Sequence, residues 1–160
     1  TVSTDPEGMV REGHWLREIA DNLTVKFPLT VDGIKATKIL SDEGIPVNVT
    51  LCFSLGQALL AAKAGATFIS PFVGRLDDIG LEGMQLIQDI RLIYDNHSFD
   101  TEILTASARH VPHLLVAARL GSDVITASPK VFWQLFEHPM TDNGLAAFLA
   151  DWEKTGQKLE

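Results

Sequence analysis

Three stretches of the sequence share a pattern that limits the possible folds more than any other feature. In each, a glycine suited to end a helix is followed by a short apolar, β-branched run that finishes on a hydroxyl residue. These stretches are 42–50, 64–70 and 120–126, and the runs 23–27 and 102–105 also have the composition of strands. Strands that follow helices in this way indicate a parallel sheet with helical crossovers.

The segments between these strands carry the three- and four-residue spacing of amphipathic helices. Asp5 is placed to cap the first helix, with Pro6 at its first position, and Ser54 is placed to cap another. We expect helices over residues 5–20, 33–43, 54–64, 81–94, 111–120, 129–137 and about 143–156.

The alternation of helices and strands predicts an α/β fold and a single domain over residues 1–160. Five strands suffice for an open doubly wound sheet, but no glycine-rich phosphate loop follows the first strand. Polar and reactive side chains at the carboxyl ends of successive strands favour a (β/α)8 TIM barrel. A complete barrel typically has about 250 residues, so a chain of 160 residues predicts a partial barrel.

Composition excludes several classes of function. The net charge of −8 argues against nucleic acid as a partner and supplies no basic patch for an anionic membrane. No apolar run approaches the roughly 20 residues that a membrane-spanning helix needs. The single cysteine, Cys52, excludes an internal disulfide and suits a reducing compartment, so we expect a cytoplasmic protein. Cys52 itself is interpreted as a small buried hydrophobe.

Lys26 is the most informative residue, because it lies within the apolar run 23–28. One interpretation is a desolvated amine that attacks a carbonyl and forms a Schiff base. The other is a lysine at an exposed strand end whose amine reaches water. Asn48 and Thr50 alternate with valines and therefore share one face, which in a barrel is the lumen. They orient a water or the amine there, or form an internal polar pair without chemistry.

Two arginines follow later strands, each close to a hydroxyl residue. Arg75 can hold a phosphate through two hydrogen bonds, or it can pair with Asp77 or Asp78. Ser107 and Arg109 repeat the theme after the next strand. Two such groups at neighbouring strand ends predict a site for a small phosphate. The five histidines form neither an HxH nor an HExxH pattern, so we expect no metal site.

Taken in order, these segments resemble the transaldolases. The segment 22–30 is similar to the Schiff-base lysine strand of that family, and 46–54 is similar to the strand that follows it. The match continues in register through 69–78. The segment 104–109 resembles the family's phosphate-binding segment, and 148–156 looks like the end of the short transaldolases.

The resemblance implies a role for each candidate residue and a reaction without a cofactor. Lys26 would form the Schiff base with a ketose phosphate, while Asn48 and Thr50 would position the catalytic water. Ser70 and Phe72 would shape the pocket, and Arg75, Ser107 and Arg109 would hold the phosphate of the sugar. The resemblance also implies a homo-oligomer, because short transaldolases often form ring-like assemblies.

The implied activity is that of a transaldolase of the pentose phosphate pathway, which moves a dihydroxyacetone unit between sugar phosphates. The related fructose-phosphate aldolases carry a tyrosine where this chain has Phe72, so Phe72 favours transfer. Two alternatives stay open. One is an aldolase that releases dihydroxyacetone, and the other is a catalytically inactive barrel fragment that needs a partner chain.

The resemblance also implies that the chain corresponds to strands four to eight of the barrel. The family's first three strands carry an aspartate, an asparagine and an acidic or amide residue, and Thr1 to Thr4 resemble the tail of the third. We therefore expect an incomplete or processed chain. Five strands alone should not close a barrel, because closure fixes strand number, tilt and stagger together.

Overall fold

The computed structural model describes residues 1–159 and divides into two compact units. The first unit, Thr1–Ala127, contains the whole sheet, and the second begins at Ser128. The strands are β1 (Val25–Pro28), β2 (Val47–Cys52), β3 (Phe68–Pro71), β4 (Glu102–Ala108) and β5 (Val124–Ala127). The helices of the first unit are α1 (Pro6–Arg17), α2 (Val31–Asp42), α3 (Leu55–Lys63), α4 (Val73–Asp77), α5 (Gly83–His97) and α6 (Val111–Arg119).

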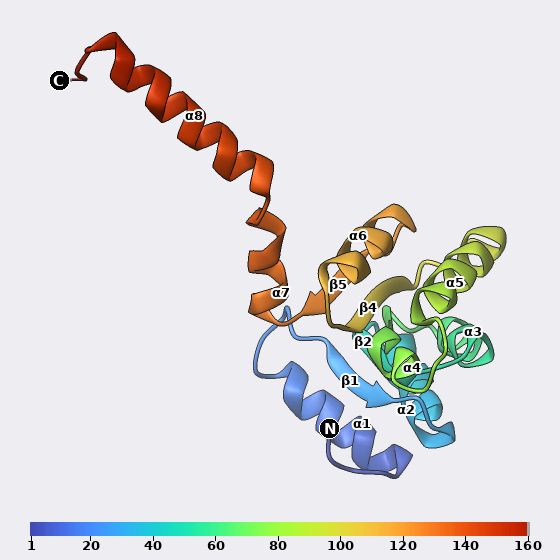
Figure 1. Cartoon of the computed structure of the whole chain (residues 1–160). Helices are drawn as coiled ribbons and strands as arrows, with labels where there is room; N and C mark the ends of the chain where they lie inside the picture. Colours follow the sequence, from blue (N-terminus) through green and yellow to red (C-terminus); the bar gives the residue numbers. More distant parts are fainter. Residues whose placement is uncertain (160) are drawn as a thin grey trace. The chain divides into compact units, whose positions relative to one another are not determined.

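The five strands form one parallel sheet in the order β1-β2-β3-β4-β5. The colours of Figure 1 follow this order from blue β1 to orange β5. An open doubly wound sheet reverses its strand order at a switch point, and this sheet has no reversal. Sequential right-handed crossovers place successive helices on the same side of the sheet, as in a (β/α)8 barrel. The fold is therefore α/β with the topology of a partial TIM barrel, as the sequence predicts.

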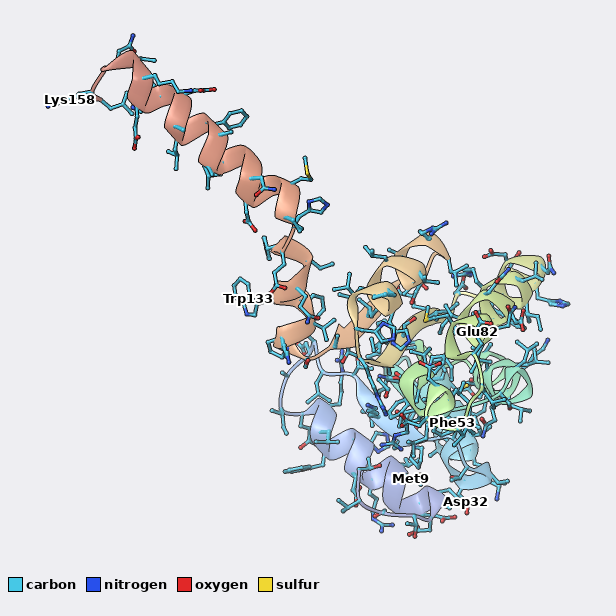
Figure 2. The ribbon with its side chains drawn as sticks, in the orientation of Figure 1. Met9, Asp32, Phe53, Glu82, Trp133 and Lys158 are labelled. Atoms are coloured by element: carbon cyan, nitrogen blue, oxygen red, sulfur yellow. The ribbon has the colours of Figure 1, made fainter. Side chains whose placement is uncertain are left out.

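The two faces of the sheet have different chemistry. Val25, Phe27, Val47 and Val49 are fully buried in the hydrophobic core, together with side chains from the helices. Met9 of α1, labelled in Figure 2, belongs to this core and is also fully buried. The residues between these apolar positions point to the opposite face, because successive side chains of a strand alternate. That face receives the polar side chains of β1 and β2.

The predicted caps are confirmed, and they set where the helices begin. Asp5 accepts a hydrogen bond from Gly8 N at 2.8 Å, ahead of Pro6. Ser54 accepts one from Gln57 N at 3.3 Å at the start of α3. Thr30 caps α2 in the same way, so that this helix begins two residues before the predicted start.

The second unit contains α7 (Pro129–Trp133), the short 3-10 helix η1 (Gln134–Phe136) and α8 (Pro139–Thr155). The predicted helix over 129–137 is thus divided into α7 and η1. The last helix begins at Pro139 instead of about 143, because the His138 ring accepts a hydrogen bond from Met140 N at 3.1 Å and caps the earlier start. Within residues 1–159, no helix has the length and apolar character needed to cross a bilayer.

Neighbouring residues of β1 provide a direct test of the two faces. Phe27→Ala should lower the free energy of unfolding by roughly 3–5 kcal/mol, because it opens a cavity in the core. Lys26→Ala should change it by no more than about 0.5 kcal/mol, because Lys26 is exposed. Chemical denaturation of both variants measures the difference. Equal losses of unfolding free energy in the two variants would mean that the two faces of the sheet are assigned wrongly.

Candidate active site

Lys26 belongs to a row of polar side chains that crosses three strands on the helix-free face. It lies opposite Asn48 in the β1–β2 register, and Thr50 lies opposite Ser70 in the β2–β3 register. Ser70 is fully buried and its hydroxyl donates a hydrogen bond to Asn48 Oδ1 at 2.7 Å. Four of the predicted site residues are therefore brought to one face, with exposed Lys26 at the β1 end of the row.

Thr50 differs from the other polar groups of the row. Its Oγ1 atom is buried, yet it has no hydrogen-bond partner among residues 1–159. A buried hydroxyl without a partner costs about 1–3 kcal/mol, and such atoms in native proteins require an explanation. A hydroxyl in this state, two residues from Asn48 along the same face of β2, is suited to bind a water or a substrate hydroxyl.

Two strands carry a bulge near their carboxyl ends. The β2–β3 register shifts between Thr50 and Cys52, where Leu51 has a φ of 61°. The β4–β5 register shifts between Thr105 and Ala108, where Ser107 has a φ of 60°. Positive φ is uncommon in residues other than glycine and is especially unfavourable for a bulky leucine. Bulges of this kind redirect side chains at the rims of barrels and beside active sites.

Cys52 is buried and inert. Its Sγ lies 3.5 Å from the carbonyl oxygen of Ser54, and burial raises the pKa of the thiol to about 12. The prediction of a small buried hydrophobe is confirmed, since a thiol with this pKa is not a nucleophile at neutral pH.

Phe72 connects the sheet to the first candidate arginine. It forms a parallel bridge with Ala106 of β4, and its ring packs edge-on against Phe53 with the centroids 6.0 Å apart. The guanidinium carbon of Arg75 lies 4.9 Å from the centre of the Phe72 ring. This is a cation–π contact, which orients Arg75 without using its hydrogen-bond donors. Within the described residues Arg75 forms no ion pair with either neighbouring aspartate.

Close backbone packing brings the second arginine to the same place. Gly74, next to Arg75, lies so near the end of β4 that a β-carbon there would come within 2.3 Å of Ser107 O and 2.7 Å of Arg109 Nε. The start of α4 thus contacts the segment that carries Ser107 and Arg109. The three predicted phosphate-binding residues therefore come from two segments in direct contact.

Arg109 is held by Asp78 rather than being free. Its Nη2 donates to Asp78 Oδ2 at 2.6 Å and its Nη1 donates to the other carboxylate oxygen, so that the pair is bidentate. Both side chains are 49% exposed, and exposed ion pairs contribute only about 0–1 kcal/mol to stability. An ion pair with Asp77 or Asp78 was one of two interpretations of Arg75, but Asp78 pairs instead with Arg109, which lies 31 residues after Asp78 in the sequence.

His113 is a residue of this region that the sequence analysis did not identify. It is buried, its Nε2 contacts Asp77 Oδ2 at 2.8 Å, and its Nδ1 accepts a hydrogen bond from the Arg109 amide at 3.2 Å. Burial is the main cause that lowers the pKa of His113, and the neighbouring His110 lowers it further. The three-residue spacing of the two histidines, one capping α6 and the other in its first turn, was the available signal.

Asp77, His110 and His113 present possible metal-ligand atoms within 4.8 Å of one another. Both ring nitrogens of His113 are already engaged, one with Asp77 and the other with the Arg109 amide. A cation bound through His113 would have to displace one of these two partners.

A parallel sheet with lysine, amide and hydroxyl groups on one face, and with guanidinium groups just beyond the carboxyl ends of its later strands, is the arrangement of barrel enzymes. The family model described as Transaldolase/Fructose-6-phosphate aldolase matches residues 1–159. The chain belongs to this family, in agreement with the resemblance found in the sequence.

Curated relatives agree with this assignment. A probable transaldolase of Novosphingobium aromaticivorans is 65% identical over 99% of this chain and 73% of its own length. Probable transaldolases of Dinoroseobacter shibae and Ruegeria pomeroyi are 63% and 66% identical over the same shares. A solved mandelate oxidase variant is 22% identical with a TM-score of 0.47, over 66% of this chain and 32% of that one. That score is too low to identify a fold.

Two glycines at equivalent helix positions test the contact between α4 and β4. Gly74 and Gly56 are each the second residue of their helices, but a β-carbon at Gly56 would meet nothing within 4 Å. Gly74→Ala should cost roughly 1–3 kcal/mol through overpacking against Ser107 and should also raise KM for phosphorylated substrates. Gly56→Ala should be neutral or stabilise by up to about 1 kcal/mol. Denaturation midpoints and steady-state kinetics compare the two. If the two substitutions changed the stability equally, the close approach of Gly74 to Ser107 would be contradicted.

Proposed function

We propose that this chain catalyses the transaldolase reaction, moving a dihydroxyacetone unit from a ketose phosphate to an aldose phosphate in the pentose phosphate pathway. Membership of the family supports the class of enzyme. The observation that carries the finer proposal is the register of Lys26 with Asn48, on the face that the helices leave open. An amine beside fixed polar groups is what Schiff-base catalysis requires.

The reaction begins when the unprotonated Lys26 amine attacks the ketone of the donor. The carbinolamine takes up one proton from water and loses one water, which gives the protonated Schiff base. The C3–C4 bond then breaks and its electrons pass into the iminium, which becomes an enamine. The C4 hydroxyl proton passes to a water, and the aldehyde product leaves. The enamine next attacks the acceptor aldehyde, whose oxygen takes a proton from water. Addition of one water then releases the new ketose phosphate and restores the lysine.

Asn48 and Thr50 are proposed to bind the water that carries these protons. The unpartnered Thr50 Oγ1 supports this role, because one bound water would satisfy it. Ser70 fixes Asn48 through the hydrogen bond to Oδ1, which leaves the amide nitrogen of Asn48 as a donor toward the substrate. Ser70 therefore shapes the site by orienting its neighbour.

Arg75, Ser107 and Arg109 are proposed to bind the phosphate of the sugar. Guanidinium groups suit this task because their paired donors match the oxygens of a phosphate. Arg75 has its donors free of carboxylates within the described residues, since it rests on the Phe72 ring. The contact of Gly74 with Ser107 supports convergence of the three side chains.

Transfer is favoured over release of dihydroxyacetone by Phe72. This ring lies between Arg75 and Phe53 and provides no hydroxyl near the reacting carbons, whereas a phenol would provide a proton donor. Assays of the purified enzyme distinguish the two outcomes, because transfer consumes an acceptor aldehyde and the aldolase reaction liberates dihydroxyacetone without one.

We further propose a homo-oligomer that acts in the cytoplasm on small sugar phosphates, without nucleic acid or membrane partners. The single buried cysteine suits a reducing compartment. We also propose that residues 1–160 form a single domain, a partial barrel that corresponds to strands four to eight of the family.

The Schiff base on Lys26 can be trapped chemically. Borohydride reduction in the presence of a ketose phosphate should label one peptide, the one that contains Lys26, and Lys26→Ala should abolish the label and turnover. Because Lys26 is exposed, the variant should keep its stability, so that lost labelling cannot be attributed to unfolding. Lys35→Ala, also exposed, serves as the matched control and should remain labelled. Retained labelling in Lys26→Ala would place the Schiff base elsewhere, and no labelling of the wild type would favour an inactive fragment.

The phosphate role of Arg109 has a kinetic signature. Arg109→Ala should raise KM for phosphorylated donors by roughly 10–100-fold with little change in kcat, because it removes binding that the ground and transition states share. Unphosphorylated donors should be nearly unaffected. If both kinds of donor were impaired equally, Arg109 would not be a phosphate ligand.

A further inference from the structure

A chain of hydrogen bonds reaches from Asp77 through the His113 ring to the backbone of Arg109. We infer that His113 is a positioning residue that fixes the Arg109 backbone, and through it the direction in which the guanidinium is presented to the sugar phosphate. This inference rests on the proposed phosphate role of Arg109.

The two ring nitrogens of His113 have opposite hydrogen-bonding roles, one as acceptor and the other as donor. Nδ1 accepts from the Arg109 amide at 3.2 Å, so it must be unprotonated. Nε2 lies 2.8 Å from Asp77 Oδ2 and donates its proton to that carboxylate. One neutral tautomer, with the proton on Nε2, satisfies both bonds. Burial lowers the pKa of His113 and so maintains the neutral ring at pH 7.

Asp77 is itself fixed on its other side. Its Oδ1 accepts a hydrogen bond from Gly83 N at 2.9 Å at the start of α5, so one carboxylate joins α4, α5 and α6. The next residue, Asp78, holds the Arg109 guanidinium through two hydrogen bonds. Consecutive aspartates therefore hold both ends of Arg109, Asp78 directly and Asp77 through the imidazole.

The backbone at this point needs such support. Arg109 comes two residues after Ser107, which has a φ of 60° at the β4 bulge. A left-handed serine persists only where the surrounding structure fixes it. The His113 bond is made to the amide just beyond the bulge, and His110 covers the ring with the two centroids 3.7 Å apart.

A matched pair of substitutions separates the two bonds. In His113→Asn the side-chain oxygen is as many bonds from Cα as Nδ1 and still accepts from the Arg109 amide, while the contact with Asp77 is lost. In His113→Gln the side-chain nitrogen matches Nε2 and still donates to Asp77, while the acceptor for Arg109 is lost. Both variants replace a buried ring with an amide, so a purely structural role predicts similar effects.

We expect His113→Gln to raise KM for phosphorylated donors about tenfold, with kcat and the kinetics of unphosphorylated donors within about twofold of the wild type. His113→Asn should keep KM within about threefold. Equal KM values in the two variants, or a larger effect in His113→Asn, would overturn the inference. If the His113 variants give one of these results while Arg109→Ala still raises KM selectively, the inference fails and the proposed phosphate site stands. If Arg109→Ala has no selective effect, the proposed phosphate site fails and the inference with it.

Nitrogen NMR of the unsubstituted enzyme gives a test that does not depend on the folding of variants. The His113 ring should carry its proton on Nε2 at pH 7, and its Nδ1 should show coupling to the Arg109 amide. A proton on Nδ1 would overturn the inference, because that tautomer cannot accept from the Arg109 amide.

Discussion

The alternation of side chains along β1 and β2 is the constraint on which the candidate site depends. Val25 and Phe27 are fully buried against the helices, so Lys26 between them must lie on the other face. The parallel register then places Asn48 opposite Lys26. A slip of one residue would exchange the faces and bury the lysine in the core, which fixes the register strongly. The hydrophobic core thus determines where the reactive amine can be.

The proposed phosphate site depends on a different constraint, the absence of a side chain at Gly74. Only a glycine allows α4 to approach the carbonyl of Ser107 so closely, and this approach places the residue before Arg75 against the Arg109 side chain. The positive φ of Ser107 and the register shift of β4 occur at the same contact. The backbone strain, the missing β-carbon and the charged side chains are therefore parts of one local arrangement.

Sequence reasoning predicted what depends on local patterns. The strands were predicted from β-branched runs. Asp5 and Ser54 were predicted as caps because each places a polar side chain just before a segment with the apolar spacing of a helix. The helix α4 was missed because its five residues are too few to show periodicity. The Asp78 partner of Arg109 and the bonds of His113 were missed because they join residues distant in sequence. Such contacts depend on how the strand ends meet, which no local pattern encodes.

The net charge of −8 does not oppose binding of a phosphate, because exposed charges are screened over about 8 Å at physiological ionic strength. What matters is the local balance, and here Asp78 neutralises Arg109. Because that pair is half exposed, it is weak, and a doubly charged phosphate can compete for the same donors. In the proposed site, Asp78 holds the Arg109 guanidinium until the phosphate replaces it. Arg75, held by an aromatic ring, needs no such exchange. Within residues 1–159, the two arginines therefore differ in what a phosphate at the proposed site must displace, because Arg109 has a carboxylate partner and Arg75 has none.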